Sequence, residues 1–136
     1  MPEAVFMTHS ASDDTRRRFP KTRHLLRHSD FERVYKQGRR HFARHLTVFY
    51  LRREGEPAVS GLRIGFTVGR VLGKAVERNR MRRVLREAAR LSGLERALDV
   101  DVVVNPKKSL LDAEFREVLG EMGKALEVIE KSFGKF

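Results

Sequence analysis

The residues best suited to chemistry in this chain are arginines gathered in the stretch KAVERNRMRRVLREAAR, residues 74–90. The stretch holds seven Lys or Arg residues against two Glu. Guanidinium groups bind phosphate through paired hydrogen bonds and stack on nucleobases, so this composition favours recognition of a polyanion over catalysis. At 100° per residue of helix, most of the basic residues fall on one side. That side carries Asn79, Arg82, Arg83, Arg86 and Arg90, with Arg78 and Arg80 at its edges.

The other side of the same helix is apolar and carries Met81, Val84, Leu85, Ala88 and Leu91. The helix is therefore amphipathic, and we expect it to pack on its own domain through that side. The basic side sets like charges four residues apart, which costs roughly 0.2–0.5 kcal/mol per pair in an isolated helix. A solvated helix side is the plain alternative. The excess of arginine over acidic residues favours an anionic partner instead.

Other residues that could do chemistry form weaker candidates. His41 and His45 fall on a predicted strand, where four residues span about 13 Å, so they cannot share a metal ion and are expected at the surface. Asp99 and Asp101 would face the same way about 7 Å apart and could hold a divalent ion, although plain strand-edge carboxylates are favoured. No Ser/His/Asp or Cys/His arrangement is legible. We therefore predict no catalytic residue and no metal site in the protein itself.

The whole chain is strongly basic, with a formal net charge of +11 and a pI near 10.8 over 136 residues. Such a charge points to a polyanionic partner, with nucleic acid as the first candidate and an anionic membrane surface as the second. There are no cysteines, which argues against disulfides and thiolate metal sites. No apolar run approaches the roughly 20 residues of a membrane span, and the first residues lack a secretory-signal pattern. We expect a cytoplasmic protein.

The elements that must position these residues follow from periodicity. SDFERVYKQG predicts a short helix with Ser29 as its N-cap and Gly38 directly after its last turn. HFARHLTVFYLRR, rich in aromatic and β-branched residues, predicts a strand over about 42–52. The alternation in GLRIGFTVG (61–69) predicts a second strand, paired with the first as a hairpin.

Helix and strand alternate further along the chain. The arginine-rich helix is predicted over 74–91, and ALDVDVVVNP predicts a third strand that Pro106 ends. The last helix is predicted over 112–132 with Asp112 as N-cap, because apolar residues recur there every three or four positions. This succession predicts an α+β fold, an α/β sandwich with a small central sheet.

Residues 1–22 and 23–136 differ in character. The first segment is polar, ends near the run Arg16-Arg17-Arg18 and shows no apolar periodicity. It predicts a flexible basic tail, either a solvated arm or an additional contact to nucleic acid. The second segment holds all the predicted elements and is expected to form one domain.

The stretch IGFTVGRVLGKAVERNRMRRVLREAAR (64–90) closely resembles the signature of the bacterial ribonuclease P protein subunit. In that family a strand leads through a basic, glycine-containing loop into a motif G-N/K-A-V-x-R-N-R-x-K/R-R-x-x-R-E, which residues 73–87 resemble. DFERVYKQG (30–38) resembles the family's first helix, and DVDVVVNPKKSLLDAEF (99–115) resembles its last strand and the beginning of its last helix. The resemblance covers about residues 22–133.

The resemblance implies an architecture and a division of labour. It implies a small central mixed sheet with helices packed on it, in the order roughly α-β-β-β-α-β-α, with a left-handed βαβ crossover. It also implies that a large RNA subunit performs Mg²⁺-dependent hydrolysis of precursor tRNA, with the Mg²⁺ mainly RNA-bound. The protein would bind that RNA and the 5′ leader of the substrate. It would be a subunit of an endoribonuclease without catalytic residues of its own, and no stable homo-oligomer is expected.

Two binding surfaces are implied by the family motif. The first would face the catalytic RNA and comprises Arg70, Lys74, Arg78, Asn79, Arg80, Arg82, Arg83, Arg86 and Arg90. Its loop reads Gly69-Arg70-Val71 where the family usually has Ser-Lys-Lys, so one cation is missing. The second is a cleft between the first helix and the sheet, expected to hold the leader with Phe31, Tyr35 and Phe49. Bases stack on aromatic rings, so this role predicts partly exposed rings, whereas a plain core would bury them.

Two other functions stay open from the sequence. A structural ribosomal protein would have a similar charge and fold, and a protein-only nuclease would cut RNA unaided.

Overall fold

The computed structural model describes residues 4–5, 28–53, 62–92 and 99–133. Predictions that fall elsewhere, including most of the tail at 1–22, lie outside these residues. The elements in chain order are β1 (Ala4–Val5), α1 (His28–Gln37), β2 (Arg39–Phe42), β3 (Leu46–Arg52), β4 (Arg63–Thr67), the 3₁₀ turn η3 (Arg70–Leu72), α2 (Ala75–Leu91), β5 (Val100–Pro106), the 3₁₀ turn η4 (Lys108–Asp112) and α3 (Phe115–Phe133).

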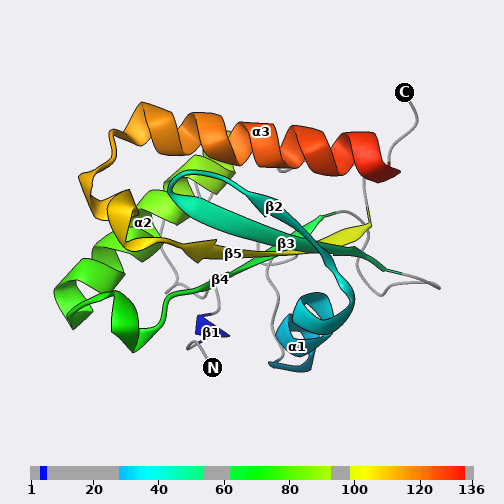
Figure 1. The fold of residues 1–136 in the computed structure, drawn as a ribbon, viewed down its shortest axis with the longest axis horizontal. Helices are drawn as coiled ribbons and strands as arrows, with labels where there is room; N and C mark the ends of the chain where they lie inside the picture. The colour runs from blue at the N-terminus through cyan, green and yellow to red at the C-terminus, as the bar shows by residue number, and fades with distance from the viewer. Residues whose placement is uncertain (1–3, 6–27, 54–61, 93–98, 134–136) are drawn as a thin grey trace, which may run out of the picture.

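The strands form one mixed sheet in the order β1-β4-β5-β3-β2 (Figure 1). β4 and β5 are parallel, and the other neighbouring strands are antiparallel. The predicted α+β fold with a central mixed sheet is confirmed, and after the two-residue β1 the elements follow the order α-β-β-β-α-β-α. α2 connects the adjacent parallel strands β4 and β5, and the left-handed sense of this crossover stays a prediction.

The predicted hairpin between the strands at 42–52 and 61–69 is wrong. β5 lies between β3 and β4, pairing with β3 along Leu46–Arg52 and with β4 along Arg63–Phe66. The true hairpin joins β2 to β3, and its turn at residues 43–45 falls within the first predicted strand. The run VDVVVN is buried almost throughout, as expected for a strand that lies between two others. The alternation of apolar residues in 42–52 and 61–69 predicts two strands, but it does not show that a third strand separates them.

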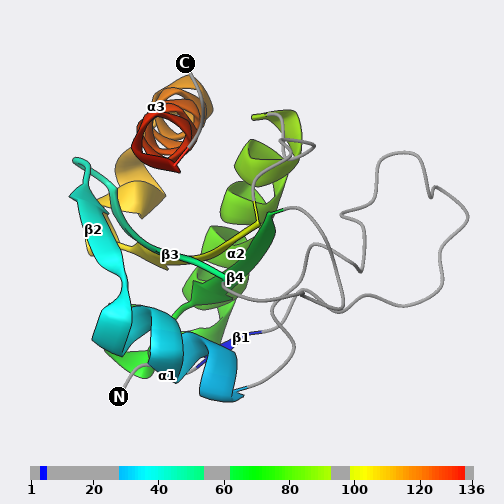
Figure 2. The same ribbon diagram turned by 90° about the vertical axis from the view of Figure 1, so that its right-hand side faces the viewer.

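The sheet separates two layers of helices (Figure 2). α2 and α3 cover one face and form the main core with Val100, Val102 and Val104 of β5. α1 covers the other face, where Phe31 and Val34 pack on Val103 in a smaller cluster. Because successive residues of a strand point to opposite faces, β5 contributes to both cores.

The predicted helix ends differ in detail from the structure. Ser29 lies within the first turn of α1 rather than before it. Asp112 ends the 3₁₀ turn η4 and is not the N-cap of α3, whose beginning is held by the Glu117 carboxylate accepting the backbone N–H of Glu114 at 3.1 Å. Gly38 follows α1 as predicted, and a Cβ there would lie 2.4 Å from the Val34 carbonyl oxygen, so close approach requires a glycine.

β1 places Ala4–Val5 beside Phe66 and Thr67 of β4. These two residues fall within the segment 1–22, whose flexibility stays a prediction. In the described part of the chain, no helix has the length and apolar character needed to cross a membrane.

Candidate RNA interface

The turn that leads into α2 fixes the beginning of the arginine-rich helix. Gly73 has φ of +147°, a conformation that residues with a Cβ rarely adopt. A Cβ at Gly73 would also lie 2.4 Å from Oε1 of Glu77. That carboxylate accepts the backbone N–H of Lys74 at 2.9 Å and so closes the first turn. The side chains of Arg70 and Lys74 are left exposed on either side of the glycine.

We call the nine predicted RNA-binding residues the arginine face. Five of its side chains are exposed, Arg70, Lys74, Asn79, Arg80 and Arg83. Four are half-buried, Arg78, Arg82, Arg86 and Arg90. All nine lie on α2 or the turn before it, so the structure brings them together as the sequence predicted.

In the part of the chain that the structure describes, few carboxylates approach this face. Arg90 pairs with Glu87, and Arg82 donates to the side-chain oxygen of Asn79. Within the described ranges, Arg80 and Arg83 form no ion pair with a carboxylate, nor does Arg86. Among the described residues, the N–H donors of these three guanidinium groups are therefore available to a partner.

The opposite side of α2 anchors it in the main core. Met81, Leu85, Ala88 and Ala89 are fully buried, and Val84 packs on the same cluster from its edge. The prediction is wrong for Leu91, which is 49% exposed at the end of the helix. The helix is thus held from one side and displays arginines on the other.

The expected exposure of Phe31 is also wrong. Its ring is 1% exposed beneath α1, where it packs with Val34 on Val103. Full burial of a phenylalanine contributes roughly 1.5–3 kcal/mol, so Phe31 serves to dock α1 on the sheet. A base cannot stack on this ring in the structure.

Tyr35 and Phe49 form the accessible part of the predicted cleft. Both rings are half-buried, and they meet edge to face with centroids 4.9 Å apart. The guanidinium carbon of Arg40 lies 5.5 Å from the centroid of the Phe49 ring. We call Tyr35, Arg40 and Phe49 the aromatic patch. It offers two rings and a cation beside one another, the combination that suits single-stranded RNA.

The hydroxyl of Tyr35 is anchored to two strands. It lies 2.7 Å from Oγ1 of Thr67 on β4 and 2.9 Å from Oδ1 of Asn105 on β5. Burial raises the pKa of Tyr35, and this outweighs the two hydrogen bonds, which act to lower it. The phenol is therefore neutral near pH 7 and keeps a proton to donate. These contacts fix the ring at the end of α1.

A buried ionic cluster on the same face of the sheet was not predicted from the sequence. The Asp101 carboxylate is fully buried and accepts hydrogen bonds from Arg33 at 2.7 Å, Arg53 at 2.6 Å and Arg63 at 2.9 Å. Asp30 of α1 approaches Arg33 at 3.2 Å. The prediction of a strand-edge carboxylate is wrong for Asp101, because β5 is a central strand.

The cluster holds Asp101 ionised. Burial acts to raise the pKa of Asp101, but the hydrogen bonds and charges of Arg63 and Arg53 outweigh it and lower that pKa. For Arg63, burial acts to lower the pKa, and the bond and charge of Asp101 raise it instead. Asp99 approaches Arg53 at 3.6 Å. With its oxygens facing guanidinium groups, Asp101 does not fit a divalent cation.

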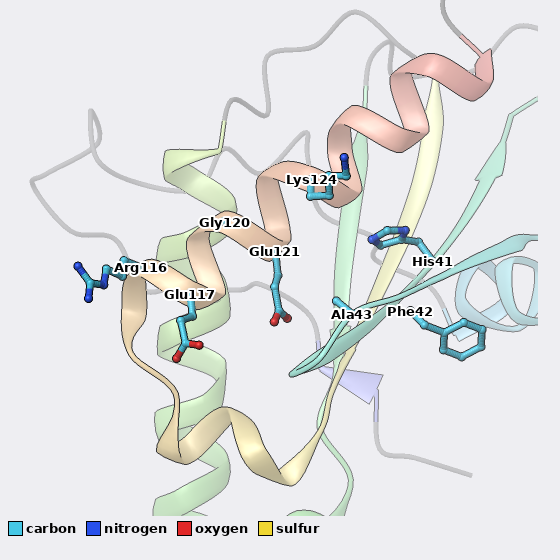
Figure 3. Close-up of a pocket in the computed structure, with 8 residues that line it drawn as sticks. All are labelled: His41, Phe42, Ala43, Arg116, Glu117, Gly120, Glu121 and Lys124. Carbon is cyan, nitrogen blue, oxygen red and sulfur yellow. The ribbon is translucent and has the colours of Figure 1, made fainter.

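The two histidines considered for a metal site have different surroundings. His45 is 5% exposed rather than at the surface, and its Nδ1 is 2.9 Å from the hydroxyl of Ser109. His41 lines an open groove between β2 and α3, opposite Glu121 and Lys124 (Figure 3). Over the described ranges, no three His, Cys, Asp or Glu side chains come together in a way that could hold a metal ion.

The sequence of this chain is similar to those of curated proteins. The curated "Ribonuclease P protein component" of Oleidesulfovibrio alaskensis is 43% identical over 101 residues, covering 70% of this chain and 79% of that protein. The protein of the same name from Desulforapulum autotrophicum is 34% identical over 116 residues, covering 85% and 96%.

Solved structures give the same result. The RNase P protein from Thermotoga maritima, solved in complex with 1-(4-fluorophenyl)-2-thiourea, superposes with a TM-score of 0.63 at 27% identity, over 75% of this chain and 96% of that one. The Staphylococcus aureus RNase P protein has a similar fold, with a TM-score of 0.66 at 24% identity over 78% and 94%. The sequence model of the family described as Ribonuclease P matches residues 19–130. This chain therefore belongs to the ribonuclease P protein family.

Proposed function

We propose that this chain is the protein component of a cytoplasmic ribonuclease P, in which an RNA subunit removes the 5′ leader of precursor tRNA and the protein binds both RNAs. Family membership supports the partnership. The arginine face carries the proposal, because it presents exposed guanidinium groups on a helix whose other side is fixed in the core.

The arginine face acts by charge in this proposal. Two RNA molecules repel each other, and cations placed between them neutralise phosphates and release condensed counterions. Arginine suits this role because its planar fork donates two parallel hydrogen bonds to a phosphate. The net charge of +11 strengthens attraction at a distance, and that attraction weakens as salt rises.

The aromatic patch supports binding of the leader. Its two rings are accessible, whereas Phe31 is not, so we assign the stacking role to Tyr35 and Phe49 alone. Arg40 beside Phe49 adds a cation for the backbone of the same strand. Because stacking on a ring does not depend on which base is stacked, binding would tolerate different leader sequences.

Magnesium supplies the hydrolytic chemistry in this proposal and is bound by the RNA. The described residues offer no carboxylate cluster for it. The protein's own contribution is to hold phosphates and leader bases in place and to lower repulsion between the two RNAs.

Reconstitution at low magnesium tests the function. We expect the protein to raise cleavage of precursor tRNA by the catalytic RNA, since its cations replace part of the screening that Mg²⁺ provides. A ribosomal protein would give no such increase, and a protein-only nuclease would cut without the RNA. Either result would contradict the proposal.

Replacement of Tyr35 by Ala tests the leader site. We expect affinity for leader-bearing precursor to fall by roughly 1–3 kcal/mol, the contribution of one base stacked on a ring. Affinity for mature tRNA should stay the same, which equilibrium binding to both RNAs would measure. Tyr35→Phe is the matched control, because it keeps the ring and removes only the hydroxyl. Equal decreases for both RNAs would exclude the patch as a leader site.

A further inference from the structure

Phe42 is an unusual residue in this surface. It ends β2 and is 65% exposed, whereas the next most exposed aromatic ring of the described residues, Phe115, is 38% exposed. A single exposed apolar side chain needs no explanation by itself. The position of this one beside the aromatic patch makes it informative.

The orientation of β2 places Phe42 on the face of the sheet that α1 covers. Arg39 stacks on Phe133 of α3, and the next residue, Arg40, stacks on Phe49 on the opposite face. Since side chains alternate along a strand, Phe42 shares the face of Arg40. Figure 3 agrees, because the ring of Phe42 points away from α3 and that of His41 points toward it.

The register gives the place of Phe42 relative to the patch. Phe42 is paired with Thr47, and Arg40 with Phe49. Phe42 and Phe49 are thus diagonal neighbours on one face, a separation of roughly 7–8 Å that long aromatic side chains bridge. Thr47 is in turn paired with Asn105, which holds the hydroxyl of Tyr35. Phe42 therefore lies one row beyond the aromatic patch, at the outer strand of the sheet.

The surroundings of Phe42 favour a nucleic acid over an apolar partner. The turn after it carries Arg44, which is exposed, and the end of β5 is followed by the exposed cations Lys107 and Lys108. Lys107 donates to the carbonyl of Ala43 at 2.7 Å, which brings it beside this turn. The groove on the α3 side of β2, which Phe42 also lines, holds Glu117 and Glu121 together with Arg116 and Lys124, but the ring points away from it (Figure 3). A ring beside the cations of this turn matches the pattern of single-strand binding surfaces, in which bases stack while the backbone follows positive charge.

We propose that Phe42 is a specificity-determining residue that stacks one leader base beyond those held by Tyr35 and Phe49. Leaders long enough to reach Phe42 would therefore bind more tightly than shorter ones. The inference rests on the proposed function. The occupant is the single-stranded leader, and contact of this ring with the catalytic RNA instead is an outcome of the test.

The experiment uses the reconstituted holoenzyme and precursor tRNAs whose leaders are shortened one nucleotide at a time. For Phe42→Ala we expect about fivefold or greater loss of affinity with long leaders, and no loss below the length that reaches Phe42. Phe42→Trp should retain the affinity, and Phe42→Leu should reduce it, because leucine is apolar but has no ring. Phe115→Ala is the control for removal of an exposed phenylalanine. Thermal melting of each variant checks that the fold is intact.

Phe49→Ala separates this inference from the proposed function. If Phe49→Ala weakens leader binding and Phe42→Ala does not at any length, the role of Phe42 is overturned and leader binding at the patch stands. If neither variant changes leader binding, the leader site itself is overturned. Full retention of affinity by Phe42→Leu would also overturn stacking at Phe42. An equal decrease for Phe42→Ala with mature tRNA, which has no leader, would overturn it as well and would point to the catalytic RNA as the occupant.

Discussion

Two groups of arginines in this protein have the same side chain and opposite surroundings. Arg33, Arg53 and Arg63 converge on the buried Asp101 between α1 and the sheet. Arg80 and Arg83 project from α2 with exposed side chains, and neither pairs with a carboxylate of the described residues. The first group therefore holds the protein together, and the second is available to bind something outside it.

The difference shows what decides the role of an arginine. A guanidinium group needs an anion wherever water is excluded, so the arginines around Asp101 require that carboxylate. On α2 water solvates the charges until a polyanion replaces it. The neighbouring acid Glu77 is occupied with the N-terminus of the helix, and Glu87 pairs with Arg90 at its end. Among the described residues, Arg80 and Arg83 are thus left without a carboxylate partner.

The largest effect on the free energy of unfolding is expected for a substitution in the buried ionic cluster around Asp101. Asp101→Asn removes the anion and leaves three guanidinium groups facing a neutral amide, so the free energy of unfolding should fall by about 3–5 kcal/mol. Urea unfolding at neutral pH would measure it. Asp112→Asn is the control, since Asp112 is an exposed carboxylate on η4, and its effect should stay within about 0.5 kcal/mol. Equal effects of the two substitutions would show that the buried cluster does not stabilise the fold.

The dependence of stability on pH tests the role of Asp101 in a second way. The pKa of Asp101 is lowered in the folded protein, so its contribution is complete above the unfolded value of about 3.9 and disappears as pH falls through the lower folded value. The free energy of unfolding of the wild type should therefore drop more steeply below about pH 4 than that of Asp101→Asn. Urea titrations at several pH values would show the two curves converging. Parallel curves would mean that Asp101 does not carry the effect.

A smaller effect on stability, with a clear effect on binding, is expected at the arginine face. Arg83→Ala with Arg86→Ala should change the free energy of unfolding by less than about 0.5 kcal/mol per site. The slope of log affinity for the catalytic RNA against log salt should flatten by roughly 0.7–0.9 for each phosphate that the protein no longer neutralises. Titrations at four or more salt concentrations would measure the slope.

The control for this double variant removes the same charge elsewhere. Arg116→Ala with Lys124→Ala takes two cations from α3, where their side chains are 84% and 65% exposed. An equal flattening in both variants would mean that net charge, and not the arginine face, governs RNA binding.

Local patterns in the sequence were reliable where one element decides the outcome. The period of α2 predicted both its buried and its basic side, because a helix fixes which residues share a face. The same local information failed for the strand pairing, since the position of β5 between β3 and β4 depends on segments far apart in the chain. The predicted exposure of Phe31 failed for a similar reason. The docking of α1 on the sheet buries Phe31 and leaves Tyr35 half-buried on the same apolar side, and the sequence of the helix does not show how it docks.

The sequence by itself determined the family, the amphipathic arginine helix and the charge that favours a polyanion, because spacing and composition are properties of the chain alone. Only the tertiary structure decided that Asp101 is the centre of a buried ionic cluster and that Phe42 shares a face with Phe49. Both depend on which strands are neighbours and in which register. The strand order and register follow from the burial of β5 on both of its faces. This burial requires the helices on both sides of the sheet, and therefore the whole domain.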